Sequence, residues 1–317
     1  MIVSASYRTD IPAFYADWFM ARLEAGYADV RNPYGGPDYR VDLTPGAVDG
    51  FIFWTRNLAR FAAPLAEVHR LGISSVVQMT VTGYPRALET SVVEPARAVE
   101  QLHAVAERYG PRAAVWRYDP ILDSELTPPD WHRESFANLA AELAGATDEV
   151  VVSWATVYRK TARNLTAAAR AHGFAWSDPP DDEKRALLSD LAGIAARHGM
   201  RMTLCSQPGL LANVGSCKAP VTAARCIDVG RLSDIAGRPI AAKQRGNRPG
   251  CDCAQSRDIG AYDTCPHGCV YCYAVQNRAL AQRRHKAHDP GAASLTAESV
   301  GRDAAPSSQP QVPEKPA

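Results

Sequence analysis

Short apolar runs alternate with amphipathic segments through the first two thirds of the chain. The apolar runs are rich in β-branched and aromatic residues and have the length of buried strands. They cover residues 2–7, 51–54, 75–82, 113–118, 150–157 and 202–205, with a further short candidate at 27–32. Between these runs, apolar residues recur every three or four positions, which is the spacing of one buried helix face. The pattern therefore predicts a series of strand–helix units.

Capping residues support the expected helix boundaries. Asp10 and Asp130 precede amphipathic segments, where a carboxylate can accept hydrogen bonds from the free backbone N–H groups of a helix start. Gly26, Gly72 and Gly110 follow such segments, where a left-handed residue often ends a helix. Each helix is thus expected between two strands.

Alternation of strands and helices is typical of parallel βαβ units. At least six such units precede Cys205. We therefore predict an α/β fold in the form of a full or partial (β/α) TIM-like barrel, with a doubly wound sheet as the alternative. No Gly-rich dinucleotide-binding fingerprint follows the first strand, which disfavours that alternative.

The chain is expected to divide into three parts. Residues 1–205 hold the strand–helix units and form the predicted barrel. In residues 206–285 the periodicity fades and cysteines become frequent, which predicts a cysteine-rich lobe wrapped on the barrel. Residues 286–317 are rich in Pro, Ala, Ser and Gln and have few large apolar side chains, so they are expected to be disordered.

Composition narrows the class of protein. Hydrophobic residues are 46% and charged residues 22% of the chain, as in an ordinary globular protein. The formal net charge of +1 gives no bulk basic field for nucleic acid or anionic membranes. No apolar run approaches the roughly 20 residues that cross a bilayer, and the first residues lack the pattern of a signal peptide. We therefore predict a cytoplasmic protein without membrane contact.

Three cysteines near the end of the predicted lobe carry the strongest chemical signal. Cys265, Cys269 and Cys272, here called the cysteine triad, are separated by three and then two residues. In a loop this spacing brings three thiolates close together, which suits an iron–sulfur cluster. A cubane of four irons with three cysteine ligands keeps one iron open for a substrate or cofactor. The alternative is structural zinc, which needs a fourth ligand such as His267 or an upstream cysteine.

The triad spacing resembles that of the radical S-adenosylmethionine enzymes, including the aromatic Tyr271 directly before the last cysteine. A longer run resembles the C-terminal signature of the uncharacterised family called domain of unknown function 1848, and this resemblance extends from Ser4 to about Asn277. The residues that carry it are Cys251, Asp252, Cys253, Ser256, Asp258, Ile259, Gly260, Tyr262, Thr264, Cys265, Gly268, Cys269, Tyr271, Cys272, Tyr273 and Ala274.

The first resemblance implies a chemistry. It implies that the triad holds a [4Fe–4S] cluster, that S-adenosylmethionine binds the open iron, and that a reductant such as flavodoxin or ferredoxin supplies electrons. Tyr271, Arg8 and Thr55 are then candidate cofactor-binding residues. The sequence does not indicate the substrate, either a small molecule or a macromolecule.

Four further cysteines form a candidate second metal centre, here called the four-cysteine set: Cys205, Cys226, Cys251 and Cys253. Cys251 and Cys253 supply two ligands from one extended segment, and Cys205 lies at a predicted strand end. Cys205 and Cys226 resemble cysteine positions of the same uncharacterised family, whereas Cys217 does not. We predict that the set binds a second cluster or Zn²⁺.

Polar residues close several predicted strands, where a barrel places catalytic groups. Arg117 and Asp119 are candidate catalytic residues of this kind, with Asp119 as a proton acceptor. The alternative for this pair is a buried ion pair at the barrel rim. Alternation also turns three polar residues toward one face of their strand, which suggests a polar pocket: Gln78, Thr80 and Thr82.

Three functions follow, in order of preference. The first is an iron–sulfur enzyme of radical S-adenosylmethionine type with an unknown substrate. The second is a non-catalytic binding protein whose C-terminal lobe is stabilised by zinc or clusters. The third is a nucleic-acid modification or repair enzyme, because the radical superfamily includes spore photoproduct lyase; the near-zero net charge argues against it.

Overall fold

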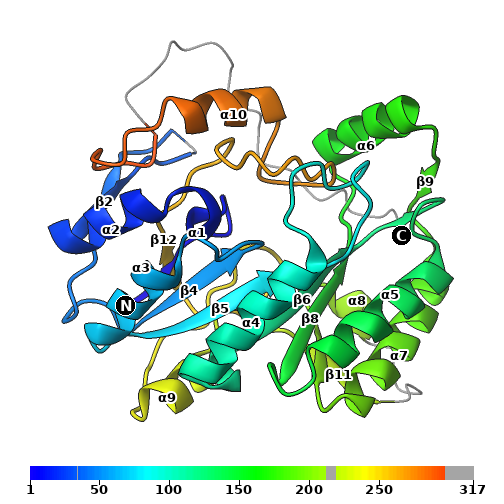
Figure 1. The fold of residues 1–317 in the computed structure, drawn as a ribbon, viewed down its shortest axis with the longest axis horizontal. Helices are drawn as coiled ribbons and strands as arrows, with labels where there is room; N and C mark the ends of the chain where they lie inside the picture. Colours follow the sequence, from blue (N-terminus) through cyan, green and yellow to red (C-terminus); the bar gives the residue numbers. More distant parts are fainter. Residues whose placement is uncertain (34, 212–218, 297–317) are drawn as a thin grey trace.

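The computed structural model describes residues 1–33, 35–211 and 219–296. A parallel sheet of eight strands runs through its centre, in the order β11-β10-β8-β6-β5-β4-β1-β12 (Figure 1). The strands are β1 (Ile2–Ser4), β4 (Gly50–Thr55), β5 (Ser74–Thr80), β6 (Ala114–Ile121), β8 (Glu149–Trp154), β10 (Arg201–Leu204), β11 (Val221–Ala223) and β12 (Ser256–Asp258).

Helices connect these strands, as the periodicity predicts. The helices of the first part are α1 (Ile11–Phe14), α2 (Ala16–Ala25), α3 (Ala62–Arg70), α4 (Pro95–Tyr109), the 3₁₀ turn η1 (Pro111–Ala113), α5 (Pro129–Glu142), α6 (Arg159–His172) and α7 (Asp181–Arg197). Later in the chain come α8 (Pro208–Leu211), α9 (Val229–Ala236) and α10 (Arg278–Lys286). Asp10 caps α1 by accepting a hydrogen bond from the Ala13 N–H at 2.9 Å, as expected, whereas Asp130 lies inside the first turn of α5.

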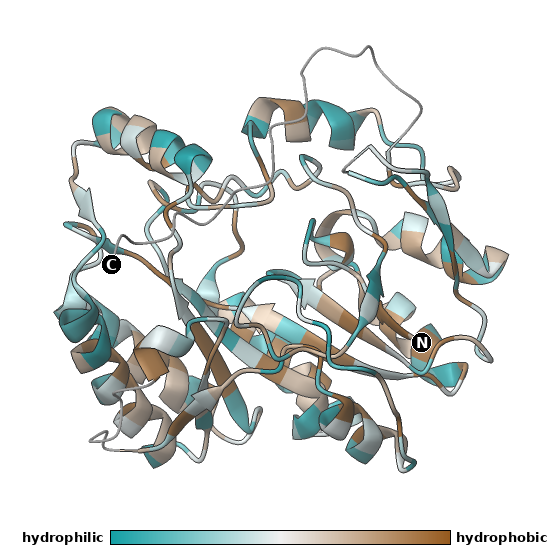
Figure 2. Ribbon diagram, turned by 180° about the vertical axis from the view of Figure 1, so that it is seen from behind, coloured by the Kyte–Doolittle hydropathy of each residue, from teal (hydrophilic) through white to brown (hydrophobic). Residues whose placement is uncertain are grey.

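Each central strand buries both of its faces, which explains the continuous apolar runs. In β4, Phe51 and Phe53 point to the helix-covered face and stack on each other, each with its ring 5.5 Å from that of Phe19 in α2. Ile52 points the other way and packs under residues 224–254, which include α9. The strands are the apolar centre of the ribbon in Figure 2. One sheet face therefore carries the longer helices, and the other carries α9 and the segment with the four-cysteine set.

The α/β class and the parallel sheet are confirmed. Successive strands from β1 to β11 are added on one side of the sheet, and β12 joins the opposite side of β1. Within the described residues no pairing joins β11 to β12, so a closed barrel is not shown.

Two short pairs of strands lie outside the sheet. The predicted strand at 27–32 is instead β2 (Tyr27–Val30) of an antiparallel pair with β3 (Tyr39–Asp42). The second pair is β7 (Asp123–Ser124) with β9 (Trp176–Ser177). The apolar residues of 27–32 are few, so nothing in their pattern separates a hairpin arm from a sheet strand.

The predicted lobe and tail contribute to the fold. Both β11 and β12 come from residues 206–285, so this part supplies the two edges of the sheet. Of the tail, residues 287–296 contact α2 and β2, since Trp18 donates a hydrogen bond to Ala292 O at 2.9 Å and Asp29 N–H donates to Ala293 O at 2.9 Å. The rest of the predicted disordered tail, 297–317, lies outside the described residues.

His132 is a buried titratable group that gives a testable pH dependence. Its Nδ1 lies 2.8 Å from the Tyr118 hydroxyl and its Nε2 lies 3.0 Å from Leu122 O. Burial lowers the pKa of His132 from 6.5 to about 4. The unfolded chain therefore takes up a proton as pH falls below about 6.5, while the folded chain does so only near pH 4, and stability falls through this window. We expect a loss on the order of 3 kcal/mol from this residue.

The matched variant for this prediction is His132→Gln, which keeps a donor for Leu122 O but does not titrate. Urea unfolding between neutral pH and about pH 4.5 should show a steeper loss of stability for the natural chain than for the variant. Equal slopes would contradict the assignment.

Candidate functional site

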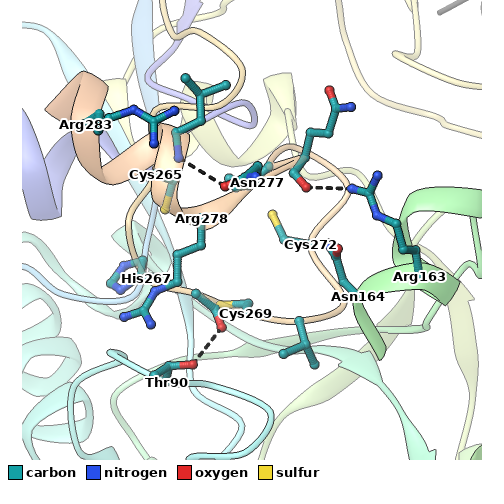
Figure 3. Close-up of a pocket in the computed structure, with 15 residues that line it drawn as sticks. Thr90, Arg163, Asn164, Cys265, His267, Cys269, Cys272, Asn277, Arg278 and Arg283 are labelled. Carbon is teal, nitrogen blue, oxygen red and sulfur yellow. Dashed lines mark hydrogen bonds between the residues drawn. The ribbon is translucent and has the colours of Figure 1, made fainter. Parts of the chain in front are cut away.

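The cysteine triad lines one open pocket of about 570 Å³ (Figure 3). All three side chains are partly exposed. The triad loop lies at the carboxyl edge of the sheet, because Tyr271 within it hydrogen-bonds Arg56, the residue that follows β4. Three thiols that face one pocket of this size can bind a common centre and still leave room for a small molecule.

The triad loop is docked on the irregular segment that follows β5. Ser91 N–H donates to His267 O at 2.9 Å, and Val270 N–H donates to Leu88 O at 3.0 Å. These backbone bonds resemble the pairing of two short strands, and a single bridge joins Glu89 to Cys269. The loop is therefore held by main-chain contacts that do not depend on a metal.

Gly268 is required by this geometry. Its φ is +79°, and a Cβ at this position would lie 2.5 Å from Arg278 Nε. The Arg278 side chain crosses the loop here and donates to Ser91 Oγ at 2.5 Å and to Pro266 O at 3.4 Å. A side chain at Gly268 would displace this arginine from the pocket wall.

A buried polar network lies between the triad loop and the carboxyl end of β4. Arg56 and Glu89 form an ion pair of 2.8 Å, and Arg56 also donates to the Tyr271 hydroxyl at 2.5 Å. Tyr271 in turn donates to Glu89, and Thr82 donates to the same carboxylate at 2.7 Å. Tyr271, predicted to bind a cofactor, thus turns its hydroxyl into the network below the loop.

A second set of buried contacts joins the loop to the start of the chain. Asp10 accepts hydrogen bonds from Thr55 Oγ1 at 2.7 Å and from the Arg56 N–H at 2.8 Å, in addition to its role as a helix cap. His267 Nε2 lies 2.8 Å from the same carboxylate, and its Nδ1 lies 3.4 Å from Ser91 O. Both ring nitrogens of His267 thus face oxygen acceptors, which disfavours His267 as a fourth metal ligand. Thr55, a predicted cofactor residue, is an anchor for Asp10.

The pocket wall is cationic. Arg163, Arg278 and Arg283 line it, and none of the described residues around it is Asp or Glu. Arg163 donates to Gln276 O at 2.8 Å. The Arg283 guanidinium forms no hydrogen bond or ion pair with any residue that the structure describes, so it is free to meet an anionic ligand.

The surroundings of the three triad thiols raise their pKa values. Burial, and then the charges of Asp10 and the other two thiols, raise the pKa of Cys265 well above its usual range. Burial raises the pKa of Cys269 to about 12, against the lowering effect of Arg56, and burial also raises the pKa of Cys272. Metal binding would therefore release protons from all three.

The four-cysteine set comes together on the sheet face opposite the longer helices. The Cys205 and Cys226 sulfurs lie 3.8 Å apart. Cys226 also hydrogen-bonds Cys253, which hydrogen-bonds Cys251. The bond from Cys253 lowers the pKa of Cys251 to about 6. The predicted convergence of these four positions is thus present as a chain of sulfur contacts.

Arg117 and Asp119 lie beside the four-cysteine set and not beside the triad pocket. Arg117 donates to Cys226 Sγ at 3.0 Å and forms an ion pair with Asp119. Burial raises the pKa of Asp119, but the Arg117 charge and hydrogen bonds from Ser153 and Arg117 bring it below its usual value. This is the geometry of the buried ion pair that was the alternative, and their predicted catalytic role stays a prediction.

Arg8 and Tyr273 both contact the segment that follows β1 and do not line the triad pocket. Arg8 lies 3.8 Å from Asp258 and stacks over Tyr7 and Tyr262, outside the triad pocket. The Tyr273 hydroxyl donates to Tyr7 O. Arg8 does not line the triad pocket, so its role in cofactor binding stays a prediction.

Sequence reasoning missed several residues of both sites. The arginines of the pocket wall and Glu89 carried no signal, because helix and loop arginines are common on any surface. The Arg248 Nη2 atom lies 3.4 Å from Cys205 Sγ. In the sequence, Arg248 belongs to a short basic segment, residues 243–248, whose pattern is typical of a solvent-exposed loop. Only its nearness to Cys251 in the sequence could have pointed to the sulfurs.

Metal ligation is not preformed in either place. Over residues 1–33, 35–211 and 219–296, no group of three or more His, Cys, Asp or Glu side chains is arranged to hold a metal ion. A metal or cluster would have to draw the side chains closer, and its binding energy would stabilise that arrangement.

Comparison with known proteins gives a family without a reaction. The family model described as Domain of unknown function (DUF1848) matches residues 2–274. No curated protein matches the chain. None of the described helices combines the length and the apolar character needed to span a bilayer.

Proposed function

The chain belongs to the family described as Domain of unknown function (DUF1848), and from its site we propose that it is an iron–sulfur enzyme of radical S-adenosylmethionine type. The observation that carries the proposal is the convergence of the three triad cysteines on one open pocket. The one-directional order of strands β1 to β11 and the helices on one face support a partial (β/α) TIM-like barrel as its frame.

The donor set fits a cluster. Thiolates are the usual ligands of iron–sulfur clusters, and the loop offers three of them without a fourth protein ligand, since His267 is engaged by Asp10. A structural zinc site would be closed by four ligands and would not need an adjoining pocket. Cys265, Cys269 and Cys272 would hold the cluster, and with S-adenosylmethionine it would supply one-electron reduction and hydrogen-atom abstraction.

The chain's own residues would bind, orient and compensate charge. Arg56 lies beneath the loop, where its charge lowers the pKa values of Cys269 and Cys272 and favours their thiolate forms. Arg283 is free to bind a carboxylate or phosphate on the pocket wall. The Arg56–Glu89–Tyr271 network fixes the loop, so that the three sulfurs keep their positions during exchange of ligands in the pocket.

Metal analysis tests this proposal. After reconstitution with iron and sulfide without oxygen, the desalted protein should keep about four irons and four sulfides at the triad. Loss of all iron and sulfide on desalting would contradict it. Tight zinc at the triad would instead favour the non-catalytic, metal-stabilised alternative.

A specific observation favours nucleic acid as the substrate class of a second candidate function. Helices α6 and α10 flank the triad loop at the same end of the molecule and are largely hydrophilic (Figures 1 and 2). Each contains four Arg or Lys residues and neither contains Asp or Glu. Although the net charge of the chain is near zero, these two helices place a group of positive charges around the pocket. A positively charged surface of this kind can bind the phosphate backbone of a nucleic acid.

Salt dependence tests this positively charged surface. Binding to a labelled single-stranded DNA should weaken steeply as salt rises, and the variant Arg170→Gln/Arg283→Gln should lower the slope of log K against log salt by about 1.4, or about 0.7 for each lost charge. The control Arg97→Gln/Arg108→Gln removes two charges from α4 and should leave the slope unchanged. Binding that ignores salt, or equal effects of the two variants, would contradict a nucleic-acid substrate.

A further inference from the structure

The four-cysteine set lies apart from the triad pocket and has its own surroundings. Cys205 follows β10, Cys226 follows β11, and Cys251 and Cys253 precede β12. Three segments distant in sequence thus bring sulfurs to one buried place on the sheet face that carries no long helix. None of the four lines the triad pocket.

The distance between two of the four sulfurs fits a single metal ion, and the other sulfurs would have to move closer to complete the site. In a tetrahedral Zn²⁺ site with bonds of about 2.3 Å, neighbouring sulfurs are about 3.8 Å apart. The Cys205 and Cys226 sulfurs lie 3.8 Å apart. In a cubane each cysteine binds a different iron, which holds the ligand sulfurs farther apart than one shared ion does.

The surroundings provide donors for thiolate sulfurs. Arg117 Nη1 lies 3.0 Å from Cys226 Sγ, and Arg248 Nη2 lies 3.4 Å from Cys205 Sγ. The Ile227 N–H donates to Cys253 Sγ at 3.5 Å. Four thiolates around Zn²⁺ carry a net charge of about −2. The two guanidinium groups offset this charge, Arg117 from a buried position and Arg248 from an exposed one.

We propose that Cys205, Cys226, Cys251 and Cys253 bind one Zn²⁺ ion that fastens residues 224–254 across the sheet. The ion joins the ends of β10 and β11 to the segment that leads into β12 and then to the triad loop. Gln78 supports the same segment by donating to Cys226 O at 3.0 Å. The role is structural, and it holds independently of the cluster proposed for the triad.

Removal of the triad cysteines allows metal binding at the four-cysteine set to be measured alone. The full-length variant Cys265→Ala/Cys269→Ala/Cys272→Ala, expressed with zinc and iron in the medium, should keep about one zinc per chain, with no acid-labile sulfide. Adding Cys226→Ala should lower the zinc at least tenfold, whereas adding Cys217→Ala, outside the proposed set, should leave it unchanged. Absence of zinc, or iron with sulfide in the triad-free variant, would overturn the proposal.

X-ray absorption on the natural chain covers the case in which the triad-free variant fails to fold. The zinc edge should show four sulfur neighbours at about 2.3 Å. Nitrogen or oxygen neighbours in the first shell, or no zinc in the purified protein, would overturn the proposal. Loss of the cluster with retention of this zinc signal separates a failure of the proposed enzyme function from a failure of this site.

Discussion

Cys269→Ala is expected to abolish the iron–sulfur cluster and all activity that depends on it. The Cys269 sulfur faces the triad pocket from the segment that pairs with Glu89. With two ligands left, the loop cannot hold a cubane, and the raised pKa values of Cys265 and Cys272 give the remaining thiols little tendency to ionise without metal. Iron and sulfide measured after anaerobic reconstitution should fall by at least tenfold.

Cys226→Ala is the matched control for this prediction. It removes a more deeply buried cysteine, one of the four-cysteine set, so the triad cluster should form while the zinc is lost. The two variants should thus show opposite metal contents. Full retention of iron and sulfide by Cys269→Ala would rule out the triad as the cluster site.

Glu89→Gln is expected to lower the free energy of unfolding by about 3 kcal/mol, because it removes the only carboxylate that forms an ion pair with the buried Arg56 among the described residues. Asp10 remains nearby and offsets part of the Arg56 charge. The side chains of Arg56 and Glu89 are only 10% and 4% exposed. The same change removes the charged acceptor for Tyr271 and Thr82, so the triad loop should also become less ordered. Urea unfolding of the metal-free protein measures the first effect, and the rate of cluster loss measures the second.

Two further variants make this result specific. Glu100→Gln removes a partner of the exposed Arg97–Glu100 pair, whose side chains are 71% and 63% exposed, and should change stability little. Arg56→Gln/Glu89→Gln removes both buried charges and should be more stable than Glu89→Gln alone. A Glu89→Gln variant as stable as Glu100→Gln would contradict the network's role.

The apolar pattern predicted the central strands well because each of them is buried on both faces. The runs that contain Phe51, Val77 and Val151 correspond to β4, β5 and β8. The edge strands β11 and β12 could not be predicted in this way. Both are three residues long; β11 (Val-Thr-Ala) is mostly exposed and β12 (Ser-Arg-Asp) is polar. Only their pairing with β10 and β1 makes them strands.

Cysteine spacing, together with the resemblance to the uncharacterised family, indicated which sulfurs lie near one another, but not what surrounds them. The convergence of Cys205 and Cys226 with Cys251 and Cys253 is present in the structure. The partners Glu89 and Arg248 could not be found, because each acts across a long sequence separation from an irregular segment. Arg117 was predicted to close its strand, but β6 continues to Ile121, so Arg117 lies inside the strand. It contacts Cys226 and does not line the triad pocket.

The most direct test of a cluster with an open iron at the cysteine triad is electron paramagnetic resonance. The protein is reconstituted and reduced without oxygen and measured with and without S-adenosylmethionine. We expect the signal of a reduced [4Fe–4S] cluster that changes when the cofactor is added, because three cysteine ligands would leave one iron of the cubane open. A cluster signal that does not change when S-adenosylmethionine is added, or a protein that binds zinc alone, would contradict the proposed enzyme function.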